Sequence, residues 1–317
     1  MKKKKKGFTL VELLVVIAII ALLMGILMPA LARVRQIAFR MVCGSNLSGI
    51  GRAMLIYAND YEDNFPRAGY QGTEWNRPVL YNAGSRATAY YAAPPGNAGQ
   101  ATISSSFYLL VKYAEVTPKS FVCKGESAST AFKATDWGLE DEEAWDFGPD
   151  DTPPAHCSYS YHLPYYVSGT PVFALSTASS EPGMAVAADR NPFLNDSTIT
   201  SGFAWGDHTK DPITGLKKYQ LGNSGPHQRE GQNVLFMDNH VTFEKQAYCG
   251  VNDDNIYTPD KPGIPREQGD TNVMACGNFG ILPNHQTDSL LVNECWGTGV
   301  QPPAPPVQPP VIPPLPP

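Results

Sequence analysis

The chain has 317 residues, of which 42% are hydrophobic and 17% are charged, a composition typical of one large or two small globular domains and not of a disordered protein. It contains 24 basic and 30 acidic residues, and because five lysines stand at positions 2–6, the rest of the chain has 19 basic against 30 acidic residues, a net charge of −11. An acidic body repels nucleic acid and anionic lipid, so the charge argues against a nucleic-acid-binding protein.

The first thirty residues combine a basic cluster with a long apolar run. Lys2–Lys6 come first, and Glu12 is the only charged side chain between Phe8 and Ala32. Residues 13–32 are apolar, which is the length that a helix needs to cross a bilayer. A charged side chain at the centre of a bilayer costs about 2.5–3.5 kcal/mol, so a carboxylate there requires a defined counterpart.

Two ordinary explanations account for an apolar segment near the N-terminus. The first is a plain transmembrane anchor, which the lysines would orient with the bulk of the chain across the membrane. The second is a secretory signal peptide cut after Ala30-Leu31-Ala32, which would leave a mature chain that begins at Arg33. The apolar run is longer than in an ordinary signal peptide, and neither explanation accounts for Glu12.

A third explanation rests on a resemblance. The stretch KGFTLVELLVVIAIIALLMGILMPAL resembles the N-terminus of type IV prepilins and type II secretion pseudopilins, and the similarity extends without a gap over residues 6–35. It implies that a membrane prepilin peptidase cuts after Gly7 and that the new first residue, Phe8, is N-methylated. It also implies that Glu12 pairs with the N-terminal amine of a neighbouring subunit, and that Pro29 is the proline that often kinks the family's helix. An ammonium group is the counterpart that a carboxylate in low dielectric requires.

An amphipathic pattern continues the apolar run. Apolar side chains recur at spacings of four and three, at Phe39, Cys43, Leu47, Ile50, Met54, Tyr57 and Tyr61. This pattern predicts that residues 33–62 form the amphipathic half of a helix whose other half, residues 8–32, spans the membrane and mediates assembly. A continuous helix over residues 8–61 would be about 80 Å long. Its glycines and Pro29 are weak points, because glycine costs about 1 kcal/mol and proline about 3 kcal/mol in a helix interior.

A second resemblance covers the end of this helix. The stretch CGSNLSGIGRAMLIYANDYEDNFP, residues 43–66, resembles a large bacterial subgroup of prepilin-like proteins with the pattern Cys-x-Ser-Asn-Leu, then Tyr-Ala-x-Asp and Phe-Pro. Members also tend to have a histidine, nine residues and then Asp-Gly near the end of the head. Here His227 is followed by ten residues and then by Asp238-Asn239, so the spacing is one residue longer and asparagine replaces glycine.

The rest of the chain predicts a globular β-rich head over residues 63–300 and a disordered proline-rich tail over residues 301–317. Asp238-Asn239 is expected to form a two-residue hairpin turn. A helix capped by a serine is predicted over Ser105–Val116. Four strands are predicted over Cys157–Val167, Gly183–Asp189, Asn233–Met237 and His240–Lys245. With residues 1–7 as a leader peptide, the expected fold is α+β and pilin-like: a long N-terminal spine helix packed on an antiparallel β-sheet head with long irregular loops.

Three polar side chains of the head are candidates for a small polar or metal site. They are Asp189, His227 and Asp238, whose carboxylates and imidazole are common metal ligands. The alternative is that Asp238 only makes the hairpin turn while His227 hydrogen-bonds to loop backbone.

An acidic stretch is a candidate calcium loop. WGLEDEEAWDFGPDD, residues 137–151, contains seven acids, and carboxylates in a loop with turn-forming residues suit Ca²⁺. Asp146, Asp150 and Asp151 are the candidate ligands, and the resemblance favours this site because loop calcium is known among pseudopilins. The alternative is a solvated acidic loop without a metal ion.

The cysteines and the aromatic residues each leave two interpretations open. Six cysteines without a CxxC motif, downstream of a membrane signal, favour disulfides in an oxidising compartment over buried thiols. Cys123 with Cys157, and Cys249 with Cys276, are candidate pairs. A platform for sugars, or ordinary packing of a sheet face, would explain the aromatic residues Trp137, Trp145, Tyr159, Tyr161, Tyr165 and Tyr166.

No GxSxG, HExxH, P-loop or Rossmann glycine pattern occurs, so the sequence predicts no enzyme and no cofactor beyond the candidate Ca²⁺. The resemblance implies a structural subunit of a type IV pilus-like or type II secretion pseudopilus-like filament. Its expected partners are the prepilin peptidase, copies of itself and other pilin-like subunits. It would cross the inner membrane once, with the N-terminus in the cytoplasm and the head periplasmic or extracellular. The alternative is a membrane-tethered extracellular binding module, for glycans or other surface ligands, that uses the same anchor without forming a filament.

Overall fold

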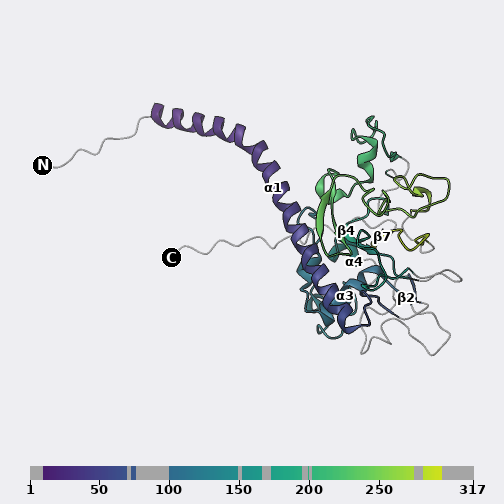
Figure 1. The fold of residues 1–317 in the computed structure, drawn as a ribbon. Helices are drawn as coiled ribbons and strands as arrows, with labels where there is room; N and C mark the ends of the chain where they lie inside the picture. The colour runs from purple at the N-terminus through teal and green to yellow at the C-terminus, as the bar shows by residue number, and fades with distance from the viewer. Residues whose placement is uncertain are drawn as a thin grey trace.

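A single long helix and a small sheet organise the molecule. The computed structural model describes residues 10–69, 73–75, 100–148, 152–165, 173–194, 199, 202–274 and 281–294. Helix α1 (Leu10–Asp60) has 51 residues, which confirms the predicted spine helix. In Figure 1 its N-terminal half projects away from the head, and its C-terminal half lies along the head.

The spine helix is continuous through the positions expected to weaken it. Pro29 lies inside α1, and the helix curves along its length in Figure 1. Gly44 and Gly51 face the sheet: a Cβ added at Gly44 would lie 3.0 Å from Asn233 Oδ1, and one added at Gly51 would lie 2.7 Å from Leu235 Cδ1. These glycines therefore allow the helix and the sheet to approach closely, which offsets their low helix propensity.

In the described part of the chain the main sheet has five strands, and every pairing within it is antiparallel. Its order is β6-β5-β4-β3-β7, with bounds β3 Tyr159–His162, β4 Ala185–Asp189, β5 Gln232–Phe236, β6 Val241–Glu244 and β7 Leu291–Val292. Helix α1 packs on β5, β6 and β4. The residues of β3, β4, β5 and β7 are buried at every position, so both faces of the central sheet are covered, whereas the edge strand β6 is partly exposed. This arrangement is the expected α+β, pilin-like fold.

Short elements surround the sheet. They are β1 (Glu74–Trp75), β2 (Gln100–Ala101), α3 (Ile103–Tyr113), α4 (Pro153–His156) and the 3-10 helices η1 (Pro118–Phe121), η2 (Ala134–Trp137), η3 (Lys218–Gly222), η4 (Gly225–His227) and η5 (Thr271–Val273). Helix α3 contacts both α1 and β3. The ring of Phe107 on this helix lies 5.0 Å from Tyr161 and 5.4 Å from Phe121, so α3 contributes to the same core as the sheet.

Two local predictions are wrong in detail. The N-cap of α3 is Thr102, whose side chain accepts a hydrogen bond from Ser105 N at 3.1 Å, and not a serine. The β5–β6 hairpin has three loop residues and not two, because Phe236 N donates to His240 O and Asn239 N donates to Phe236 O. Asn239 adopts φ 69°, the left-handed conformation that a three-residue loop needs at its last position. The short strand β7 was not predicted from the sequence.

Candidate functional site

The N-terminal half of α1 is an exposed apolar helix. Every residue from Leu10 to Arg35 is exposed, including large side chains such as Leu10 at 78% and Met28 at 68%. The helix is long and apolar enough to cross a membrane, with a mean hydropathy of 3.1 over its best 18-residue window. An apolar surface of this extent requires lipid or other apolar helices around it. Glu12 lies in the first turn of this helix, and Gly7 and Phe8 lie outside the described residues.

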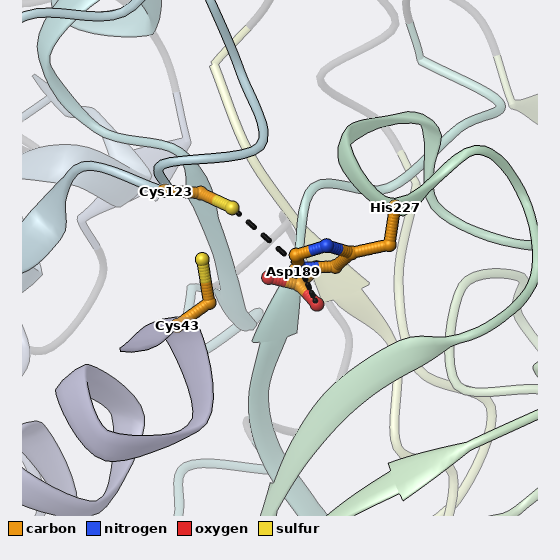
Figure 2. Close-up of side chains that lie close together, drawn as sticks. All are labelled: Cys43, Cys123, Asp189 and His227. Carbon is orange, nitrogen blue, oxygen red and sulfur yellow. Dashed lines mark hydrogen bonds and ion pairs between the residues drawn. The ribbon is translucent and has the colours of Figure 1, made fainter. Parts of the chain in front are cut away.

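A second feature lies where α1 first enters the head. Four buried side chains converge there from four separate segments: Cys43 from α1, Cys123 from the turn after η1, Asp189 from the end of β4 and His227 from η4 (Figure 2). One sulfur, nitrogen or oxygen atom from each side chain lies within 4.8 Å of the other three. Their exposures range from 0% to 4%, so the whole cluster is closed to solvent.

His227 is the centre of this cluster. Its Nε2 lies 3.2 Å from Asp189 Oδ2 and 3.6 Å from Cys123 Sγ. The backbone N of Asn233 and its side-chain Nδ2 donate to Asp189 Oδ2 at 2.6 and 3.0 Å, so β5 holds the carboxylate in place. Asp189 Oδ1 is also buried, and it accepts no hydrogen bond from any residue of the described part of the chain.

The cluster favours a charged arrangement of its members. Burial lowers the pKa of His227, but its hydrogen bonds with Asp189 and Cys43 outweigh burial and raise that pKa to about 9. The Cys123 thiol, and then His227, lower the pKa of Cys43 against the effect of burial, whereas Cys43 and burial raise the pKa of Cys123. The arrangement therefore supports a thiolate at Cys43 beside an imidazolium at His227.

The structure brings together two of the three residues predicted for a polar or metal site. Asp189 and His227 lie together, but Asp238 is in the β5–β6 hairpin, where its carboxylate contacts the His240 ring. Asp238 does not join them, because the five residues of extended β5 separate it from the end of the strand near His227, a span of roughly 16 Å. Cys43 and Cys123 were not predicted for this site.

The comparisons with known proteins concern the N-terminus. The model of the prokaryotic N-terminal methylation motif matches residues 2–28, which include Gly7, Phe8 and the first turns of the exposed helix. This chain has a prepilin-type N-terminus. Neither the curated proteins nor the solved structures contained a match to the chain.

A prepilin-type N-terminus implies processing by a prepilin peptidase. Together with the apolar half of α1, it indicates a chain anchored in the membrane with its head outside the cytoplasm. Pilin-like proteins are generally structural and not enzymatic.

The first disulfide predicted for this prepilin-like chain is not formed. Cys123 and Cys157 are both free thiols. Cys123 Sγ lies beside His227, whereas Cys157 Sγ donates to the carbonyl oxygen of Tyr159 at 3.7 Å, so the two sulfurs have different partners. For the second predicted pair, Cys249 is a free thiol and Cys276 lies outside the described residues.

The acidic stretch of the head is only partly described. Asp146 is buried, and its two oxygens accept hydrogen bonds from the Thr102 hydroxyl and, at 2.7 Å, from Phe147 N. Burial raises the pKa of Asp146 to about 6. This carboxylate thus supports the residue that caps α3. Asp150 and Asp151 lie outside the described residues, so the calcium loop stays a prediction.

The aromatic residues pack inside the prepilin-like head. Tyr159, Tyr161 and Tyr165 are 1–3% exposed, and Trp145 is 7% exposed. They do not form an exposed platform for sugars. Trp137 is partly exposed at 38%, and Tyr166 lies outside the described residues.

Proposed function

We propose that this chain is a structural subunit of a type IV pilus-like or type II secretion pseudopilus-like filament. A prepilin peptidase would cut it between Gly7 and Phe8, Phe8 would be N-methylated, and the processed chain would assemble through the N-terminal half of α1. The observation that carries the proposal is the position of the methylation motif, residues 2–28, at the start of a helix that is exposed from Leu10 to Arg35 and, apart from Glu12, uncharged up to Ala32.

Assembly exchanges one apolar environment for another. In the bilayer the exposed face of α1 contacts lipid, and in a filament it would contact the same helix of neighbouring subunits. This exchange provides little net hydrophobic driving force, so packing and polar contacts between helices decide it. Glu12 would pair with the N-methylated amine of Phe8 in a neighbour and fix the axial register of the two subunits. Such a contact is head-to-tail, and head-to-tail contacts that do not close produce an open helical polymer.

The mature N-terminus tests the proposal directly. Intact mass measurement and N-terminal sequencing of the protein in sheared surface or periplasmic filament fractions should find a chain that begins with methylated Phe8. A Gly7→Val variant should keep its lysines and stay in the membrane. Gly25→Val is the matched control, because no atom lies within 4 Å of a Cβ added at Gly25; it should be processed normally.

Other results would contradict the proposal in different ways. A native chain that retains residues 2–6 would exclude processing, and one that begins at Arg33 would indicate a secretory signal peptide. A chain that begins at Phe8 but occurs only as a membrane-bound monomer would support the tethered binding module instead of a filament subunit.

A further inference from the structure

The cluster at the junction of spine helix and head has the composition of a metal site. We propose that Cys43 Sγ, Cys123 Sγ, the Asp189 carboxylate and His227 Nε2 bind one zinc ion, and that this ion fastens the spine helix to the head. The inference concerns the folded head and does not depend on filament assembly.

The donor atoms select zinc. Two thiolates, one imidazole and one carboxylate form a mixed soft and borderline set, which suits Zn²⁺ in tetrahedral coordination. Calcium and magnesium prefer oxygen ligands, so the two sulfurs at Cys43 and Cys123 disfavour both. Each of the four ligands comes from a different segment of the chain. The proposed site therefore leaves no local spacing motif, such as CxxC, in the sequence.

The distances fit a tetrahedral ion. Bonds of about 2.3 Å to sulfur and about 2.0–2.1 Å to nitrogen or oxygen place sulfur and nitrogen ligands about 3.5 Å apart and nitrogen and oxygen ligands about 3.4 Å apart. In the structure Cys123 Sγ and His227 Nε2 are 3.6 Å apart, and one donor atom from each of the four side chains lies within 4.8 Å of the other three. The four side chains thus already surround a common centre, and small shifts of the side chains would bring them to ligand distances.

Hydrogen bonds from β5 fix the orientation of the Asp189 carboxylate, as expected for a metal ligand. Asn233 donates two hydrogen bonds to Asp189 Oδ2, while Oδ1 is buried without a hydrogen bond from the described residues. A buried carboxylate oxygen in that state is costly unless a cation meets it. Metal-ligating carboxylates are typically held by hydrogen bonds of this kind from outside the coordination sphere.

Zinc also accounts for more of the cluster than a disulfide does. Cys43 and Cys123 are both free in the structure, and an S–S bond between them would leave Asp189 and His227 buried without a role. Binding of zinc would displace the proton of the Cys123 thiol and the imidazolium proton of His227, so that both sulfurs bind as thiolates and His227 binds as a neutral imidazole. The site would then carry a net charge of −1, which the two Asn233 donors help to stabilise.

The position of the site gives the ion a structural role. Cys43 is the first buried residue of α1, and the other three ligands come from η4, from β4 and from the turn after η1. One ion would therefore join the helix to three parts of the head at the point where the exposed half of the helix ends. Because structural zinc binding is coupled to folding, the ion would stabilise this junction.

Metal analysis of the full chain tests the proposal. The protein should be purified in detergent under reducing conditions without added metal and analysed by inductively coupled plasma mass spectrometry, with about one zinc per chain expected. Cobalt in place of zinc should produce tetrahedral visible bands and a thiolate-to-cobalt charge-transfer band. Cys123→Ser and Asp189→Asn should lose most of the metal, whereas Cys157→Ser, which removes a buried free thiol outside the cluster, should retain it.

A further variant covers the case in which loss of a ligand prevents folding. Asn233→Ala keeps all four ligands, and chelator competition should show zinc binding weakened about 10–100-fold at an unchanged stoichiometry. A wild-type chain that binds neither zinc nor cobalt would overturn the proposal. So would a Cys43–Cys123 disulfide in the native protein, or equal metal loss in the Cys157→Ser and Cys123→Ser variants.

Discussion

The two halves of the spine helix differ in what surrounds them. From Leu10 to Arg35 the helix is exposed at every position. From Cys43 onward one face is buried, with Cys43, Leu47, Ile50, Met54 and Tyr57 between 0% and 3% exposed. The backbone is one continuous helix, so the difference comes from side chains alone.

The composition of each half explains this difference. The first half is apolar on all sides, and a helix of that kind needs lipid or other helices around it. The second half has an apolar stripe that packs on the sheet, and its other faces mix polar residues such as Ser45, Arg52 and Asn59 with a few exposed apolar ones. Substitutions in the first half should therefore affect assembly, and substitutions in the second half should affect folding of the head.

The largest effect on assembly is expected at Glu12. Glu12→Ala should lower filament yield by at least about tenfold, which corresponds to about 1.4 kcal/mol per subunit contact, because the neighbouring amine loses its carboxylate. Processing after Gly7 and the melting temperature of the head should not change. Quantitative immunoblots of sheared fractions would measure yield, with Val16→Ala as a control in the same segment. Wild-type yield from Glu12→Ala would exclude the ion pair as the assembly contact.

Two methionines compare the halves directly in stability. Met54 is fully buried against the head, and Met28, in the exposed half of the helix, is 68% exposed. Met54→Ala should destabilise the head by about 2–5 kcal/mol through lost burial and a residual cavity, whereas Met28→Ala should change the stability of the head by less than about 0.5 kcal/mol. Chemical denaturation of the full chain in detergent, followed by tryptophan fluorescence, measures both. Equal losses of stability from the two variants would show that the exposed half of the helix also contributes to folding of the head.

Two glycines of the second half test the contact between α1 and the sheet, because replacing either by alanine adds a single methyl group. A Cβ at Gly51 would meet the side chains of Leu235 and Asn239, whereas Gly49 is exposed and has no atom within 4 Å of an added Cβ. Gly51→Ala should destabilise the head by about 1–2 kcal/mol through overpacking. Gly49→Ala should stabilise it by up to about 1 kcal/mol through helix propensity. The same denaturation experiment measures both changes in stability. Stabilisation by both variants would contradict the close contact between α1 and β5.

The helix was predictable from the sequence because its signals are local. Hydrophobic spacing placed its C-terminal end within two residues of the observed one, Asp60. The four predicted strands were also found, since short apolar runs bounded by turn residues mark them. The role of Gly44 and Gly51 was not predictable, because a glycine that costs helix propensity and one that admits a neighbouring strand look alike in a sequence.

The buried cluster was only half predictable for the same reason. Asp189 and His227 were identified, but Cys43 and Cys123 were not joined to them, because positions far apart in the chain meet only through the packing of α1 on the sheet. The one available signal was the cysteine of the Cys-x-Ser-Asn-Leu pattern at Cys43. Asp238 was included because linear spacing from His227 does not show that an extended strand lies between the two.

The smallest effect is expected at the border between the halves, where two arginines share one acid. Arg40 Nη2 donates to Glu230 Oε2, and its guanidinium lies 4.6 Å from the centre of the Phe243 ring. Arg33 Nη1 lies 3.6 Å from Glu230 Oε1 and is 71% exposed. A double-mutant cycle of Arg40→Ala with Glu230→Gln should therefore measure a coupling of about 0.5–1 kcal/mol at pH 7, and the cycle with Arg33→Ala should measure almost none.

The pH dependence of that coupling distinguishes an ion pair from packing. The hydrogen bond from Arg40 lowers the pKa of Glu230 below its usual 4.5. Because the pKa of Glu230 is lower in the folded chain than in the unfolded chain, its ionisation stabilises the head at pH values above the unfolded pKa. This contribution is lost as the pH falls through the folded pKa. The Arg40–Glu230 coupling should thus be constant from pH 7 to about pH 5 and disappear in more acidic solution, while the contact of Arg40 with Phe243 persists. A coupling that does not change with pH would assign the contribution of Arg40 to that ring contact and to packing at the border.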